Sequence, residues 1–114
     1  MRTIIAGGRD CVVYDVLLEA LRRCGWVPTV VICGCAKGAD SLGEYWAKEN
    51  SVPIEYFPAD WKKLGRRAGP IRNIQMLENN AEALIALWDG KSRGTKHMID
   101  IATNKCLKTY IQYY

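Results

Sequence analysis

The sequence predicts an α/β fold with a doubly wound, mainly parallel five-stranded sheet that has helices on both faces. Two observations predict it. Short apolar runs rich in β-branched residues alternate along the chain with segments in which apolar residues recur at helical spacing. The central apolar runs are continuous, as in parallel strands that are buried on both faces. The 114 residues are enough for one hydrophobic core and too few for two, so we expect a single domain over residues 1–114.

Five strands are expected, most of them ending close to a glycine or a polar residue. We predict them at residues 2–8, 28–33, 52–57, 83–88 and 107–113. Pro53 lies at the start of the third strand, which indicates a sheet edge because proline cannot donate to a central ladder. The tail from Tyr110 to Tyr114 is also expected at an edge, where it could contribute to a homodimer contact.

Four helices are expected between the strands, at residues 14–24, 39–48, 70–79 and 95–105. The spacing of apolar residues turns Tyr45 of the second helix and Cys106 at the end of the last helix toward the core. Pro70 suits the first turn of the third helix, because a proline there gives up no helical hydrogen bond. Residues 58–69 are expected to form a loop, and a loop of that length in a small domain commonly has a function.

Composition and targeting signals favour a cytoplasmic protein. No apolar run approaches the roughly 20 residues that span a bilayer, and the N-terminus enters a strand pattern directly, so we expect no secretory signal and no membrane partner. The five cysteines lack CxxC spacing, and Cys24, Cys33 and Cys106 lie in apolar patterns, as in a reducing compartment. Because His97 is the single histidine and the cysteines are not paired at ligand spacing, the sequence predicts no metal site. We expect no cofactor either. The net charge of +4 is compatible with anionic ligands.

The segment 30–40 is the central motif of the chain. A β-branched strand ends at Gly34, and Gly38 opens a helix, so the helix N-terminus points its amides outward. Such a terminus binds anions, most often phosphate. We expect Gly34, Gly38 and the amides from Gly38 to Asp40 to hold a phosphate that Lys37 neutralises. The alternatives are a tight connection without a ligand and a solvated surface lysine.

Polar and glycine-containing motifs follow each of the first four predicted strands. In a parallel sheet these positions meet at one edge, and ligands bind at that edge where the strand order reverses. The first turn of the third helix is expected to reach the same edge. We therefore predict a ligand site formed by Gly7, Gly8, Arg9, Asp10, Gly34, Ala36, Lys37, Gly38, Ala39, Asp40, Asp60, Trp61, Arg72, Asn73, Asp89, Ser92, Arg93, Gly94 and Thr95.

Individual roles follow from side-chain chemistry. Arg9 and Asp10 suit ribose hydroxyls or a base edge, or they pair with each other or with helix ends. Asp60 suits a sugar, whereas Trp61 suits either stacking on a base or packing of the long loop. Asp89, at the end of a strand, is the best-placed carboxylate for catalysis or for ribose binding, and Asp10 is the other catalytic candidate. The segment 92–95 opens a second helix and suits another phosphate or a ribose, and it can also cap that helix.

Five motifs carry a family resemblance. They are Ile5-Ala6-Gly7-Gly8-Arg9-Asp10, Gly34-x-Ala36-Lys37-Gly38-Ala39-Asp40, Pro58-Ala59-Asp60-Trp61, Gly69-Pro70-x-Arg72-Asn73 and Trp88-Asp89-Gly90-x-Ser92-x-Gly94-Thr95. In this order, over nearly the whole chain, they resemble the small YspA-like (cpYpsA-related) branch of the SLOG superfamily. The resemblance implies a Rossmann-like fold, a nucleotide or ADP-ribose-like ligand, and a bacterial or phage source. Cys35 stands where the branch usually has glycine, and a positive φ there would strain a cysteine.

Three functions remain open at this point. The first is a sensor or sequestering protein for a nucleotide-derived signal. The second is an N-glycosidase similar to the LONELY GUY phosphoribohydrolases, in which glutamates follow the last glycine-rich motif. Here Lys96, His97 and Met98 follow it, so we expect binding with slow or no turnover. The third, less favoured, is a single-stranded nucleic acid binder similar to DprA, which would use the basic cluster at residues 61–67 together with Arg72, with Trp61 as its stacking surface.

Overall fold

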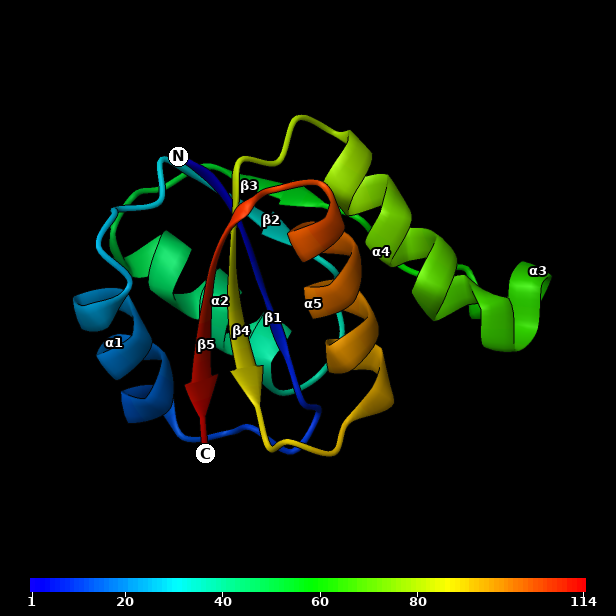
Figure 1. Cartoon of the computed structure of the whole chain (residues 1–114), viewed down its shortest axis with the longest axis horizontal. Coiled ribbons are helices and arrows are strands. Elements are labelled where there is room, and N and C mark those ends of the chain that lie inside the picture. The colour runs from blue at the N-terminus through cyan, green and yellow to red at the C-terminus, as the bar shows by residue number, and fades with distance from the viewer.

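The computed structural model describes residues 1–114 and contains a five-stranded sheet in which every pair of neighbouring strands is parallel (Figure 1). The strands are β1 (Arg2–Gly7), β2 (Val30–Cys33), β3 (Ile54–Tyr56), β4 (Ala83–Trp88) and β5 (Lys108–Tyr113). The predicted α/β fold is therefore confirmed.

Helices cover both faces of the sheet. They are α1 (Tyr14–Arg23), α2 (Ala39–Glu49), α3 (Trp61–Leu64), α4 (Ala68–Glu78) and α5 (Arg93–Asn104), with a 3₁₀ turn η1 (Gly65–Arg67) between α3 and α4. Successive side chains of β1 point to opposite faces. Ile4 packs in a core cluster with Met76 and Met98 of α4 and α5, whereas Ile5 packs in a second cluster with Leu17 and Ala47 of α1 and α2. None of the helices has the length and apolar character that crossing a membrane requires.

The strand order is β3-β2-β1-β4-β5, so the chain winds from β1 to one side and from β4 to the other. The topological switch point therefore lies between β1 and β4, and their carboxyl ends open at the edge where the arrowheads of β4 and β5 lie in Figure 1. The strands β3 and β5 form the two edges, as the sequence predicts from Pro53 and from the tail at residues 110–114.

The segment 58–69 differs from the expected loop. It contains α3 and η1, and α4 begins at Ala68, two residues before Pro70. The side chain of Asp60 caps α3 by accepting a hydrogen bond of 3.1 Å from the amide of Lys63. In Figure 1 this short helix extends from the outer end of α4, away from the sheet.

Two residues expected in the core are exposed. Tyr45 is 53% exposed and packs edge-on against Tyr14 on the outer surface of α1 and α2. Cys106 lies beyond α5, which ends at Asn104, and its positive φ of 59° belongs to the turn into β5. The prediction for Tyr45 fails because Leu42, Trp46 and Ala47 form the packed face of α2, and that for Cys106 fails because α5 ends two residues before it. The predicted strands at 28–33 and 52–57 are also longer than β2 and β3.

Candidate functional site

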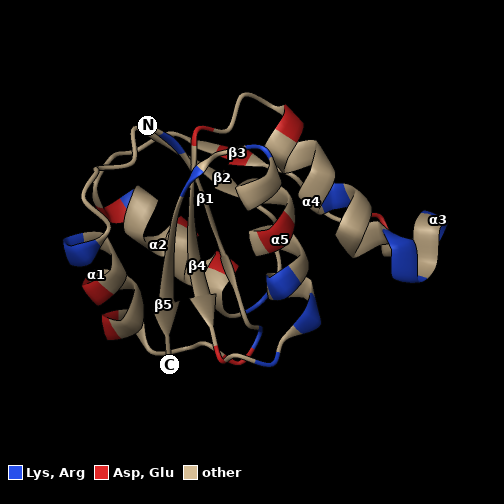
Figure 2. Cartoon of the chain, in the orientation of Figure 1, with Lys and Arg blue, Asp and Glu red and all other residues tan.

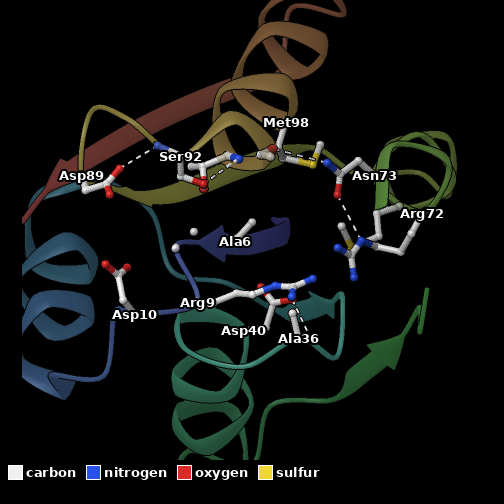
Figure 3. A pocket seen from close by; sticks show the side chains of 15 residues that line it. Ala6, Arg9, Asp10, Ala36, Asp40, Arg72, Asn73, Asp89, Ser92 and Met98 are labelled. Atoms are coloured by element: carbon white, nitrogen blue, oxygen red, sulfur yellow. Dashed lines mark hydrogen bonds between the residues drawn. The ribbon is translucent and has the colours of Figure 1, made fainter. Parts of the chain in front are cut away.

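A cleft of about 360 Å³ opens at the carboxyl ends of β1 and β4, at the switch point of the sheet (Figure 3). The residues that line it are Ala6, Gly7, Gly8, Arg9, Asp10, Ala36, Asp40, Arg72, Asn73, Met76, Asp89, Ser92, Gly94, Thr95 and Met98. Most of the residues predicted from the sequence are thus brought together, from β1, the loop after β2, α4, the loop after β4 and α5.

A second cavity of about 300 Å³ adjoins the first and shares Arg9, Ala36 and Arg72 with it. Its other lining residues are Gly34, Cys35, Lys37, Pro58, Ala59 and Trp61. Among the predicted site residues, Gly34, Lys37 and Trp61 therefore lie in this second cavity. Gly38, Ala39, Asp60 and Arg93 line neither cavity.

The sequence-based prediction missed the apolar part of the cleft, which consists of Ala6, Met76 and Met98. Helical spacing could have identified both methionines. Met76 lies one turn after Asn73, and Met98 lies one turn after Thr95, so each shares a helix face with a predicted site residue. It also missed Cys35, Pro58 and Ala59 in the second cavity.

Close packing surrounds the two glycines at the end of β1, and at Gly7 it is the backbone that leaves no room for a side chain. A Cβ atom on Gly7 would lie 2.2 Å from the carbonyl oxygen of Leu87, and one on Gly8 would lie 2.0 Å from the hydroxyl oxygen of Tyr114. That hydroxyl donates a hydrogen bond of 2.6 Å to Oδ1 of Asp10. Burial and the Asp10 carboxylate both raise the pKa of Tyr114. The loop after β1 is thereby held against β4 and the end of β5.

The N-terminus of α2 is partly occupied by oxygen atoms of the chain itself. The amide of Ala39 donates a hydrogen bond of 3.1 Å to the carbonyl oxygen of Gly8. Oδ2 of Asp40, in the first turn of α2, accepts a hydrogen bond of 3.0 Å from the amide of Ala36. The amides of Lys37 and Gly38 have no partner within the chain. Two oxygens thus already occupy part of the place where the sequence predicts a phosphate.

Asp40 is a buried carboxylate in the wall of the cleft. Burial raises its pKa, while the Ala36 amide and the positive charges of Arg72 and Arg9 oppose that shift. Arg72 lies close to it, because a Cβ atom on Gly34 would be 2.7 Å from both the Arg72 Nη1 and the Asp40 Oδ2 atoms.

Cys35, next to Gly34, has a φ of 62°. The backbone at this position has a positive φ, in which a cysteine is strained.

The N-terminus of α5 is open, in contrast to that of α2. Ser92 caps the helix, since its Oγ accepts a hydrogen bond of 3.4 Å from the amide of Thr95. The amides of Arg93 and Gly94 have no partner within the chain, and the first turn contains no acidic residue. Gly94 lines the cleft and Arg93 does not, so the Gly94 residue brings the positive end of the helix dipole to the wall of the cleft.

Asp89 shapes the loop that leads into α5. Its Oδ1 accepts hydrogen bonds of 2.8 Å from the amides of Lys91 and Ser92. These bonds lower the pKa of Asp89, so this carboxylate is ionised at neutral pH. One oxygen atom of the side chain is thereby used to hold the loop, and Oδ2 has no hydrogen bond within the chain.

Arg72 and Asn73 of α4 connect two parts of the cleft wall through hydrogen bonds (Figure 3). Nη1 of Arg72 donates to the carbonyl oxygen of Gly34, and its Nε donates a 3.1 Å bond to Oδ1 of Asn73. Nδ2 of Asn73 in turn lies 3.5 Å from the carbonyl oxygen of Gly94 and 3.2 Å from Nδ1 of His97. The loop after β2 is thus linked through α4 to the start of α5.

Arg9 is the one arginine of the cleft without a hydrogen bond or an ion pair within the chain. Its side chain extends from the end of β1 toward Ala36 and Asp40 (Figure 3), and its guanidinium carbon lies 5.3 Å from the ring centroid of Trp61. The hydrogen-bond donors of this guanidinium are therefore available to a ligand.

The cleft combines both signs of charge over an apolar patch. Two guanidinium groups, Arg9 and Arg72, face it together with the carboxylates of Asp10, Asp40 and Asp89. This lining suits a ligand that carries an anionic group and also hydroxyl or amino groups. No group of three or more histidine, cysteine or acidic side chains is arranged to hold a metal ion.

The basic cluster expected to contact nucleic acid lies outside both cavities. Lys62, Lys63, Arg66 and Arg67 are all exposed on α3 and η1, at the outer end of the molecule in Figure 2. Trp61 and Arg72 are the parts of that prediction that line a cavity.

A parallel, doubly wound sheet with a polar cleft at its switch point defines an α/β protein of the class that binds ligands at the carboxyl edge of the sheet. Comparison with known proteins gives the family. The sequence pattern of the "YspA, cpYpsA-related SLOG family" matches residues 1–64, which extend from β1 through α3. The "Gene 61 protein" of Mycobacterium phage D29 is 35% identical over 105 residues, which cover 84% of this chain and 83% of the phage protein.

The chain therefore belongs to the YspA, cpYpsA-related SLOG family. Membership of this family indicates a role in binding or processing a nucleotide-related molecule. No solved structure matches the chain significantly. The matched residues include the motifs after β1, β2 and β3, whereas Arg72, Asn73 and the α5 N-terminus lie beyond them.

Proposed function

We propose that the chain binds a phosphate-bearing nucleotide or nucleotide-derived ligand in the first cleft, as a sensor or sequestering protein. One observation carries the proposal: the open N-terminus of α5 and the guanidinium groups of Arg9 and Arg72 face the same cleft as the carboxylates of Asp10 and Asp89. Amides and guanidinium groups bind phosphate, and carboxylates accept hydrogen bonds from ribose hydroxyls. A nucleotide carries both kinds of group.

The phosphate is assigned to α5 rather than to α2. At α2 the buried carboxylate of Asp40 would repel a phosphate, and the Ala39 amide is used by the carbonyl oxygen of Gly8. At α5 the amides of Arg93 and Gly94 are free, as those of Lys37 and Gly38 are at α2, but the first turn of α5 contains no acidic residue. The Ser92 and Thr95 hydroxyls hydrogen-bond to each other, which leaves one of them as a further donor. Met76 and Met98 also line the cleft, although both side chains are almost fully buried in the core.

Thermal denaturation with a panel of ligands tests the proposal. Mono-, di-, cyclic and dinucleotides are compared with the corresponding nucleosides. A ligand at about 100 times its Kd adds about 2.7 kcal/mol to the free energy of unfolding, which raises the Tm by on the order of 10 °C. Nucleosides without phosphate are expected to raise it much less. The absence of any shift across the whole panel would refute the proposal.

Arg9→Ala provides a sharper test of the same site. Because Arg9 makes no hydrogen bond or ion pair within the chain, its removal is expected to leave the Tm almost unchanged. Affinity for a nucleotide that shifts the Tm should fall about 10-fold or more, for the loss of a charged hydrogen bond to phosphate. Arg66→Ala is the matched control, since Arg66 is exposed on η1 and lines neither cavity. Equal effects of the two substitutions would place the phosphate elsewhere.

A further inference from the structure

We propose that the two cavities are the two halves of one site, and that the ligand is a phosphate-bridged dinucleotide whose second ring stacks on Trp61. The proposal rests on the nucleotide binding proposed above and names the ligand class. It assigns the second cavity, lined by Lys37 and Trp61, to the part of the ligand beyond the bridging phosphate.

The two cavities adjoin each other and share lining residues. Arg9, Ala36 and Arg72 line both of them, so the two guanidinium groups lie where the cavities meet. Each cavity taken alone, at about 360 Å³ and about 300 Å³, is close to the lower limit of small-molecule sites. A ligand that extends through both would therefore pass its bridging phosphate groups between Arg9 and Arg72.

The two cavities differ in the charged residues that line them, as the binding of a phosphate-bridged ligand across both requires. Three carboxylates line the first cavity, whereas no acidic residue lines the second. Lys37 lines only the second cavity and adds a third positive charge to those of Arg9 and Arg72. Phosphate groups are therefore favoured at the junction and in the second cavity as well as at the α5 N-terminus, and ligand hydroxyl groups beside the three carboxylates of the first cavity.

Trp61 offers a stacking surface that is already held in place. Its side chain is 47% exposed and lines the second cavity. A Cβ atom on Gly69 would lie 3.3 Å from its Cη2 atom, so the indole packs on the backbone of Gly69 at the start of α4. The guanidinium carbon of Arg9 lies over the indole ring, 5.3 Å from the ring centroid. A nucleic acid base stacks on an indole whatever its identity.

Isothermal titration calorimetry with two probes of similar charge tests the proposal. AMP and diadenosine 5′,5″-diphosphate each carry about two negative charges at neutral pH, so a difference in affinity reports the second nucleoside rather than charge. The guanine counterparts are titrated as well. We expect the dinucleotide of at least one base to bind about 10-fold or more tightly than its mononucleotide.

Variants then locate the second nucleoside. Trp61→Ala is expected to weaken dinucleotide binding about 10-fold and to leave mononucleotide binding unchanged, and Trp61→Phe should restore most of the loss. Tyr45→Ala is the matched control, because Tyr45 is an aromatic of similar exposure on α2 that lines neither cavity. Circular dichroism and melting curves verify that each variant is folded.

Three outcomes would overturn the proposal. Equal affinity for both probes would show that the second cavity contributes nothing. Equal weakening of both probes by Trp61→Ala would show that Trp61 supports the first cavity rather than a second nucleoside. Binding of neither probe, in either base series, would refute the nucleotide function as well as the inference, whereas the first two outcomes leave that function intact.

Discussion

Replacing Gly38 by alanine should destabilise the protein strongly, although the sequence places this glycine in a ligand-binding motif. Gly38 has φ of 75° and ψ of −123°, a conformation that costs an L-residue roughly 1–3 kcal/mol. Its Cβ atom would also lie 2.3 Å from the carbonyl oxygen of Gly8 and 2.6 Å from the carbonyl carbon and oxygen of Arg9, all of them backbone atoms. Overpacking of this kind adds about 1–3 kcal/mol.

The expected sum for Gly38→Ala is therefore about 2–6 kcal/mol, out of about 5–15 kcal/mol for a domain of this size. The Tm should fall by on the order of 15 °C. Gly94→Ala is the matched control, because a Cβ atom there meets nothing within 4 Å. Its free energy of unfolding should stay the same or rise by up to about 1 kcal/mol, while the added methyl group reduces nucleotide affinity. A Tm for Gly38→Ala within about 2 °C of the parent would refute this reasoning.

Three further substitutions test single features of the site. Asp40→Asn should raise the free energy of unfolding at neutral pH. Burial raises the pKa of the Asp40 carboxyl in the folded state, so the parent protein loses stability as the pH rises through that pKa. Urea denaturation at pH 3–8 should show that the difference vanishes below the unfolded pKa of about 3.9. Ser92→Ala should lower the free energy of unfolding by about 0.5–2 kcal/mol through loss of the α5 cap, measured by the same titration. Cys35→Gly should raise the Tm slightly, because glycine relieves the strain of the positive φ, and a decrease would contradict this.

The positions of the site residues along the chain could be predicted from the sequence, because topology alone brings the ends of parallel strands to one edge. Asp10, Asp40 and Asp89 follow β1, β2 and β4, and all three line the cleft. The end of β3 reaches only the second cavity, since β3 is the far edge strand. Asp60 lines neither cavity, although Ala59 and Trp61 line the second, because its carboxylate turns to cap α3.

What each residue contacts could not be predicted. Gly38 is predicted to approach a phosphate, and the structure adds a contact that the sequence does not show, since a Cβ atom on it would lie 2.3 Å from the carbonyl oxygen of Gly8. A sequence shows that a position needs glycine, yet not whether a ligand or another part of the chain lies against it. The hydrogen bond between Tyr114 and Asp10 likewise joins residues 104 positions apart, which no local pattern reveals. The cap of α3 by Asp60 is different, because an aspartate before a helical segment is a recognisable start signal.

The two candidate catalytic carboxylates are held in a way that favours binding over cleavage. Breaking the bond between base and ribose builds positive charge on the sugar, which a carboxylate stabilises, and the leaving base needs a proton from an acid. The amides of Lys91 and Ser92 lower the pKa of Asp89, so it does not supply that proton at neutral pH. Lys96, which follows the glycine-rich motif, is paired with Asp100 at 2.9 Å and lines neither cavity.

We therefore expect the protein to hold nucleotides without releasing their bases. Incubation with an excess of nucleoside monophosphates or ADP-ribose, followed by chromatography of the free base, tests this directly. We expect less than one equivalent of free base per protein. Oδ1 of Asp10 already accepts a hydrogen bond from the Tyr114 hydroxyl, and Oδ1 of Asp89 accepts one from the Lys91 amide. Multiple turnovers that disappear in Asp89→Asn or Asp10→Asn would show that the free oxygens of these carboxylates do serve catalysis, and the protein would then be an N-glycosidase.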